Sequence, residues 1–211
     1  KPVYIYKSNI YDKDNLIDYL MASCYLPIFR EKRIIDNHYY IDGGFYDNVP
    51  TKLLIDIGYK EIYDICINGI GIDRNITRDG VKIVKICPSR NNGHILEVNK
   101  KVIKDNIMMG YYDTLRVLKN LDGYKYCFKR KSECYYKFLC RKINKRLYNR
   151  VANFFETDTY KDTVIKALEY VLEKDEVSYY DVYSSYEMIK KYRYCNKKHF
   201  IYNFLNEIKY F

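Results

Sequence analysis

The residues whose types and spacing could do chemistry lie in one short stretch, Asp42-Gly43-Gly44, directly after the apolar run Tyr39-Tyr40-Ile41. Two consecutive glycines let the backbone turn through positive φ, because no Cβ is in the way. Such a turn would hold Asp42 at the exposed end of a strand, where its carboxylate could meet a partner from another part of the chain. The same three residue types also form ordinary surface turns, so the tripeptide alone fits both interpretations.

The elements ahead of this turn can be predicted from composition and periodicity. Residues 2–6 are β-branched and aromatic, which favours a strand. Apolar residues at helical spacing then predict a helix that begins at Asp12 or Asp14. Residues 33–41 indicate a hairpin with a two-residue turn, and its second strand leads into Asp42.

A helix follows the turn. Pro50 suits the first turn of a helix, where its missing N–H is no loss, and Gly58 suits the C-terminal cap. Asn48 or Thr51 could cap the N-terminus of this helix. The helix should therefore continue directly from the glycine turn.

The remaining elements indicate an α/β class of fold with a mostly parallel sheet, followed by a helical part. Residues 61–67 and 81–87 predict two strands, and apolar residues at helical spacing between 103 and 118 predict an amphipathic helix that ends before Gly123. From residue 124 the strand signals disappear. Further helices are predicted near 132–155, 159–173, 181–193 and 197–209, with apolar stripes that include Phe138, Ile143, Leu147, Val151, Phe154, Val164, Ile165, Leu168, Val171 and Leu172.

Composition excludes several classes of protein. The chain has 211 residues, 48% of them hydrophobic, which suits a globular domain with a sizeable core. Seven irregularly spaced cysteines and three scattered histidines predict neither a disulfide framework nor a metal site, and they favour a reducing compartment. Gly69-Ile70-Gly71 lacks the third glycine and the helix of a dinucleotide site. The chain contains no run of about 18 apolar residues, so we expect no transmembrane helix.

The net charge of +10 is concentrated in residues 125–150. The basic residues there are Lys125, Lys129, Arg130, Lys131, Lys137, Arg141, Lys142, Lys145, Arg146 and Arg150, against the single acid Glu133. Aromatic residues are interleaved with them. This pattern fits a solvated helix face, and it also fits contact with an anionic membrane surface. No recognised nucleic-acid motif is present, so we expect no nucleic-acid partner.

Several elements in order resemble the patatin-like phospholipases over about residues 1–123. These are Ala22-Ser23, then Pro27, a hairpin, Asp42-Gly43-Gly44, and Asn48-Val49-Pro50 before a helix. The resemblance implies a three-layer α/β/α domain, of which residues 1–123 would be the C-terminal part, with residues 124–211 as an α-helical extension. It also implies a serine acyl hydrolase that cleaves phospholipids or other acyl lipids with a Ser–Asp dyad and without a cofactor or metal.

The resemblance assigns roles residue by residue. Asp42 matches the general base, and Gly43 and Gly44 complete the motif and permit close approach to the serine. Asn48 and Pro50 match positions that we interpret as structural. Ser23 matches a serine that ends a helix near the site and is not the nucleophile.

The sequence departs from the family pattern in one respect. It contains no Gly-x-Ser-x-Gly nucleophile elbow and no glycine-rich oxyanion loop ahead of Asp42. Since the elbow precedes this region in the family, we expect it upstream of Lys1, together with any targeting signal. We therefore expect this chain to be inactive alone. The cysteine pattern predicts a cytoplasmic protein, and the basic stretch could add peripheral membrane contact. The alternative is a non-catalytic relative that binds a membrane or a protein.

Overall fold

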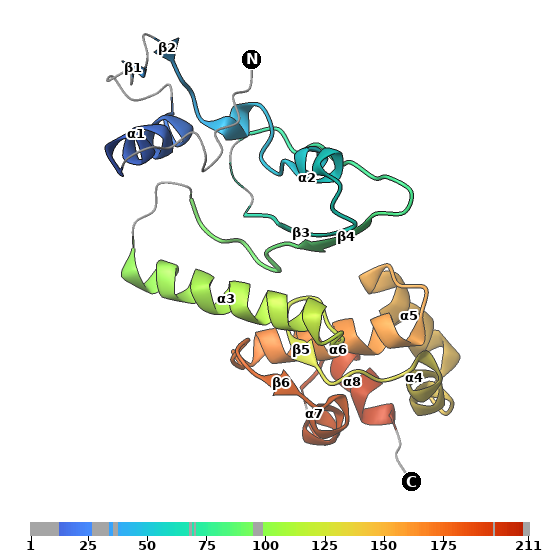
Figure 1. Ribbon diagram of the computed structural model, residues 1–211. Coiled ribbons are helices and arrows are strands. Elements are labelled where there is room, and N and C mark those ends of the chain that lie inside the picture. Colours follow the sequence, from blue (N-terminus) through green and yellow to red (C-terminus); the bar gives the residue numbers. More distant parts are fainter. Residues whose placement is uncertain are drawn as a thin grey trace. The chain divides into compact units, whose positions relative to one another are not determined.

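The structure is a computed structural model that describes residues 13–26, 34–35, 38–67, 69, 71–94, 99–195 and 197–208. The chain forms two compact units, Lys1–Cys87 and Pro88–Phe211 (Figure 1). The described residues form helices and three two-stranded sheets, and two of these sheets are parallel. This content is consistent with a partial α/β domain followed by a helical extension. The predicted boundary at residue 123, between the part that resembles the family and the helical extension, stays a prediction.

The described part of the first unit begins with a helix and a hairpin, as predicted. Their bounds are α1 (Lys13–Ser23), β1 (Ile34–Ile35) and β2 (His38–Tyr39), and the two strands pair antiparallel. The predicted strand at 2–6, Pro27 and the hairpin turn at 36–37 lie outside the described residues. The chain then turns through a single 3₁₀ turn, Gly43–Phe45, into the next helix.

Helix α2 (Thr51–Ile57) ends at Gly58, whose φ of 108° satisfies the left-handed geometry that a glycine adopts at a helix C-terminus. Strands β3 (Glu61–Ile65) and β4 (Lys82–Ile86) follow and pair in parallel, which confirms both predicted strands. On β3, Ile62 and Asp64 are buried and Glu61, Tyr63 and Ile65 are exposed, so one face of this strand covers a small core.

The second unit begins with the long helix α3 (Lys100–Leu118), which the Asn99 side chain caps. The amphipathic helix is confirmed, but its predicted apolar positions Ile103, Ile107 and Leu118 are exposed. Met109 is buried instead. The spacing of the apolar residues therefore predicted the helix correctly, but it did not predict which face of the helix is buried.

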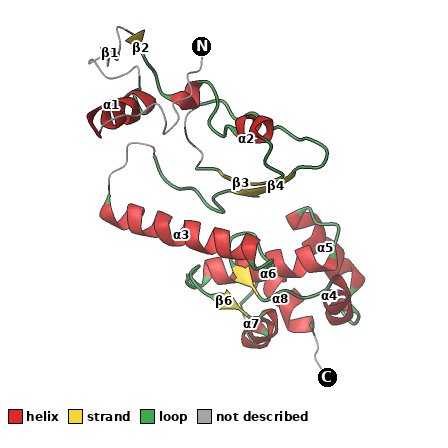
Figure 2. Cartoon of the chain, in the orientation of Figure 1, coloured by secondary structure: helices red, strands yellow, loops and turns green. Residues whose placement is uncertain are grey.

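Five further helices build the core of the second unit (Figure 2). They are α4 (Glu133–Cys140), α5 (Lys145–Phe155), α6 (Tyr160–Lys174), α7 (Ser185–Tyr192) and α8 (Phe200–Glu207). Helix α6 is the central one, because it contacts α4, α5, α7 and α8. Its predicted stripe, which includes Val164, Leu168 and Leu172, is completely buried.

Two predictions for this unit are wrong. Residues 132–155 form two helices rather than one, because Asn144 begins a new helix by accepting a hydrogen bond from the Arg146 N–H. Strands also occur beyond residue 124, since β5 (Cys127–Phe128) pairs in parallel with β6 (Val182–Tyr183).

The apolar stripe on α4 and α5 is only partly as predicted. Phe138 is 49% exposed and Phe154 is 53% exposed, although both were expected to be buried. The Arg141 guanidinium lies 3.7 Å from the ring centroid of Phe138, and this cation–π contact covers part of the ring. The aromatic residues interleaved with the basic stretch belong mainly to the core, because Tyr126, Phe128 and Tyr136 are fully buried.

Candidate active site at the Asp-Gly-Gly turn

Asp42 is held by its own turn. Its Oδ1 accepts a hydrogen bond from the Gly44 N–H at 2.7 Å, and its own N–H donates to the Tyr25 carbonyl at 2.8 Å. Within the described part of the chain, no hydrogen bond reaches the second carboxylate oxygen. The turn therefore fixes the direction of the carboxylate and leaves one oxygen able to accept a proton.

Ser23 lies beside the turn, at the end of α1. Its Oγ would be 4.0 Å from a Cβ placed on Gly43, which is an ordinary van der Waals separation, so the serine lies next to the turn without crowding it. The buried neighbour Ala22 anchors the helix end in the core of the unit. The resemblance gives Ser23 a structural position near the site, and its place beside Gly43 fits that position.

The segment that contains Gly69, Gly71 and Ile72 also holds the turn, and the sequence did not predict this contact. The Ile72 N–H donates to the Gly44 carbonyl at 2.9 Å, and the Ile72 carbonyl accepts from the Asn48 N–H at 2.9 Å. A Cβ on Gly71 would lie 2.1 Å from the Gly44 oxygen, so the close approach requires glycine here. The signal in the sequence is Gly69-Ile70-Gly71, because paired glycines mark a close backbone approach as well as a nucleotide site.

Asn48 does not cap α2, which corrects that prediction. Its side-chain Nδ2 donates to the Gly69 carbonyl at 3.3 Å, and α2 has no side-chain cap. Pro50 is the residue before the first turn of α2 rather than a member of it. Both residues lie next to the turn, where Asn48 joins it to the 69–72 segment.

Thr51 joins α2 to the sheet. Its hydroxyl lies 2.9 and 2.8 Å from the two carboxylate oxygens of Asp64 on β3, and both side chains are buried. Because a hydroxyl has one proton, it donates to one of these oxygens at a time. This buried pair positions the helix that follows the turn, and neither residue was predicted as a partner of the other.

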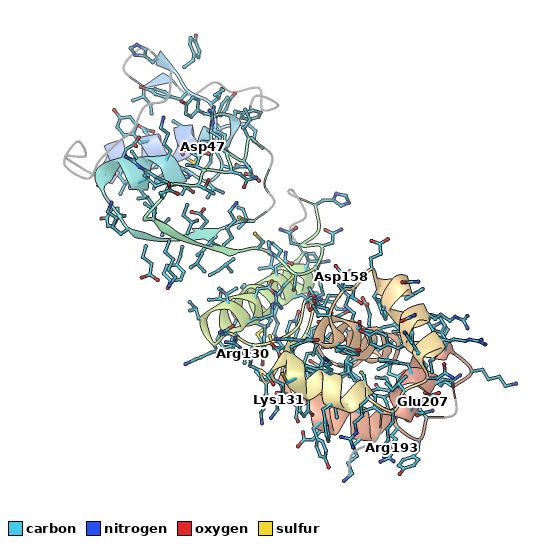
Figure 3. All side chains as sticks on the ribbon, turned by 90° about the vertical axis from the view of Figure 1, so that its right-hand side faces the viewer. Asp47, Arg130, Lys131, Asp158, Arg193 and Glu207 are labelled. Atoms are coloured by element: carbon cyan, nitrogen blue, oxygen red, sulfur yellow. The ribbon has the colours of Figure 1, made fainter. Side chains whose placement is uncertain are left out.

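A second carboxylate, Asp47, follows the turn directly in the chain and is labelled in Figure 3. Its N–H donates to the Gly43 carbonyl at 3.0 Å, and its buried Oδ1 accepts no hydrogen bond from the described residues. Arg74 covers the neighbouring Tyr46, because its guanidinium lies 4.7 Å from the ring centroid and its Nε donates to the Tyr46 carbonyl.

Two hollows of the described structure lie away from the site residues. One of them, of about 640 Å³, lies in the second unit at the start of α8, where Arg150, Lys197 and His199 are among its lining residues. In the residues that the structure describes, no cluster of histidine, cysteine or acidic side chains could hold a metal ion. The described part also contains no helix long and apolar enough to cross a membrane.

Comparison with known families matches the segment of the chain that contains this turn. Residues 2–55 match the family model described as patatin-like phospholipase, and this segment contains Asp42, both glycines, Asn48 and Pro50. No curated protein and no solved structure matches the chain. The matched segment is about a quarter of the chain, and it includes the complete Asp-Gly-Gly turn. This part of the chain is therefore similar to a family of lipid hydrolases.

Proposed function

We propose that the chain is the C-terminal part of a patatin-like serine acyl hydrolase with a three-layer α/β/α fold. In this proposal Asp42 is the general base of a Ser–Asp dyad that cleaves carboxylic esters of phospholipids or other acyl lipids. The observation that carries the proposal is the Asp42 carboxylate, which one backbone N–H orients within the segment matched to the family.

The proposed chemistry is acyl transfer. Asp42 takes the proton of the serine hydroxyl as the oxygen adds to the ester carbonyl, and this proton then passes to the departing alcohol. A carboxylate is a weak base for a hydroxyl, so the step requires close contact and stabilisation of the oxyanion. Gly43 favours close contact because it presents no side chain to the approaching serine.

The nucleophile in this proposal is a serine on a Gly-x-Ser-x-Gly elbow that precedes Lys1 in the full-length product. Its support is the order of motifs in the family, together with the absence of that motif from these 211 residues. The 211-residue chain alone should therefore show no steady ester hydrolysis.

Labelling with a fluorophosphonate tests this proposal, because such probes react with activated serines. The full-length product of the native gene should be labelled on a serine upstream of Lys1, and the Asp42→Asn variant should react at least about 100-fold more slowly. Asp56→Asn is the matched control, since Asp56 is an exposed acid on α2 of the same unit. A folded wild-type protein that takes no label would support the non-catalytic alternative instead.

The basic stretch supports a second, compatible proposal of peripheral contact with an anionic membrane. Arg130 and Lys131 lie in the segment between β5 and α4 (Figure 3), and Lys142, Lys145 and Arg146 are also exposed. Since most of the interleaved aromatic rings are buried, the contact would be electrostatic rather than insertional. Such contact would bring an acyl hydrolase to its lipid substrate.

A further inference from the structure

Cys66 and Cys87 face each other at the ends of two neighbouring strands. The parallel register of β3 and β4 pairs Ile65 with Ile86, and the Cys66 N–H donates to the Ile86 carbonyl at 2.9 Å. This bond continues the ladder by one residue and places Cys66 directly opposite Cys87. Neighbouring strands lie about 4.8 Å apart, which is inside the roughly 4.4–6.8 Å Cα separation that a disulfide requires.

The two thiols lie on the same face of the sheet, since directly opposed residues of neighbouring strands point the same way. Burial, and after it hydrogen bonding to the adjacent Cys87 thiol, raise the pKa of the Cys66 thiol to about 11. Pro88 ends the ladder here, because it has no N–H to donate to the Cys66 carbonyl. Cys87 itself is exposed and so is open to a reagent in solution.

We propose that Cys66 and Cys87 form a reversible thiol–disulfide site, whose oxidant is a small disulfide such as oxidised glutathione. The exposed Cys87 thiolate attacks the glutathione disulfide and releases one glutathione thiol. Cys66, as its thiolate, then attacks the mixed disulfide, and the second glutathione thiol leaves. Two protein thiols are thereby oxidised to one disulfide, one glutathione disulfide is reduced to two thiols, and the two protons go to the departing thiolates.

This site would act on the connection that holds the Asp-Gly-Gly turn. The disulfide would tie together both ends of the 67–86 connection, which contacts the turn through Gly69 and Ile72. Closing this connection covalently restricts the unfolded chain, so oxidation should raise the melting temperature of the chain by a few degrees. The proposal rests on the strand register and does not depend on the proposed hydrolase activity.

Peptide mapping of the 211-residue chain tests the proposal. The folded chain is equilibrated in glutathione buffers that run from fully reduced to fully oxidised, is blocked with a thiol alkylating reagent, and is digested with trypsin without reduction. The expected product is peptide 61–74 joined to peptide 86–90, which should appear as the oxidised fraction rises and vanish on addition of dithiothreitol.

Three variants make the result specific. Cys66→Ser and Cys87→Ser should each abolish the joined peptide, and Cys66→Ser should leave a glutathione adduct on peptide 86–90. Cys24→Ser is the matched control, because Cys24 is an exposed cysteine of the same unit, and it should leave the joined peptide unchanged. In the folded chain, free thiols at both positions in the most oxidising buffer would overturn the proposal. So would a glutathione adduct on Cys87 without the joined peptide.

Discussion

Gly71 shows how closely the chain is packed behind the candidate base. Its φ of 152° and the 2.1 Å separation of an added Cβ from the Gly44 oxygen both exclude a side chain at this position. The neighbouring Gly69 is different, because a Cβ there would meet its nearest atoms at 3.9 Å, an ordinary van der Waals contact. The two glycines of one motif therefore have unequal roles.

A side chain at residue 71 should push the segment that contains Gly71 and Ile72 away from the Gly44 carbonyl. We expect Gly71→Ala to lower the free energy of unfolding by roughly 2–4 kcal/mol, because the added carbon must displace backbone atoms. Gly69→Ala should cost less than about 1 kcal/mol. Urea unfolding of both variants measures this difference, and equal losses would show that the 69–72 segment does not press against the turn.

The types of the site residues could be predicted from the sequence, but some of their partners could not. Asp42 and the glycines form a local signal, since a turn is specified by the residues within it. The contacts of Asn48 with Gly69 and of Thr51 with Asp64 join residues that are distant in sequence. A capping rule sees only the next few residues, which is why Asn48 was assigned to the helix that follows it.

At the scale of elements, Glu169 on α6 fixes the segment that leads into β5. Its Oε1 accepts hydrogen bonds from the backbone N–H groups of Tyr124, Lys125 and Tyr126 at 2.7, 2.8 and 3.0 Å. Burial raises the pKa of the Glu169 carboxyl, and these three N–H groups act in the opposite direction. The carboxyl is thus held in the core by backbone donors rather than by a basic side chain.

This arrangement predicts a pH dependence of stability. A raised pKa means that the folded state binds the proton more tightly than the unfolded chain does. The stabilisation by Glu169 is therefore complete below its ordinary pKa of 4.5, and it is lost as pH rises through the raised value. Glu169→Gln should remove this pH dependence of the free energy of unfolding. Glu169→Ala should lower the free energy of unfolding by about 2–4 kcal/mol, since three backbone donors lose their acceptor.

Urea unfolding at a series of pH values measures both effects. Glu173→Gln is the matched control on the same helix, because hydrogen bonding to Lys125 lowers the pKa of its carboxyl and gives the opposite pH trend. A Glu169→Gln profile parallel to that of the wild type would contradict the assignment.

Helix positions were predicted more reliably than helix ends and buried faces. Periodicity located α6 and its buried stripe, because every neighbour of this helix belongs to the same core. It failed between α4 and α5, where Asn144 starts a new helix within an unbroken apolar pattern. It also missed β5 and β6, which are two residues long and carry too little pattern to detect.

For the whole molecule, the excess of positive charge predicts salt-dependent membrane binding. We expect the chain to bind vesicles that contain an anionic phospholipid and to be released by salt, and neutral vesicles should not retain it. Lys142→Glu combined with Lys145→Glu should weaken binding at least 10-fold, since each basic residue near the surface contributes about 1 kcal/mol. Co-sedimentation with vesicles measures this.

The matched control for this surface is Lys60→Glu combined with Lys104→Glu, two lysines outside residues 125–150. This variant carries the same net charge, so it separates a local surface from the overall charge. Equal weakening by both variants would rule out residues 125–150 as the contact, and binding independent of salt would rule out an electrostatic contact.

The central claim is that Asp42 is the general base of an acyl hydrolase, and steady-state hydrolysis of an acyl ester by the full-length product tests it most directly. We predict that Asp42→Asn lowers kcat/KM by about 10²–10⁴-fold. The 211-residue chain alone should show no turnover. Full activity in a folded Asp42→Asn protein, or turnover by the 211-residue chain that this substitution leaves unchanged, would contradict the claim.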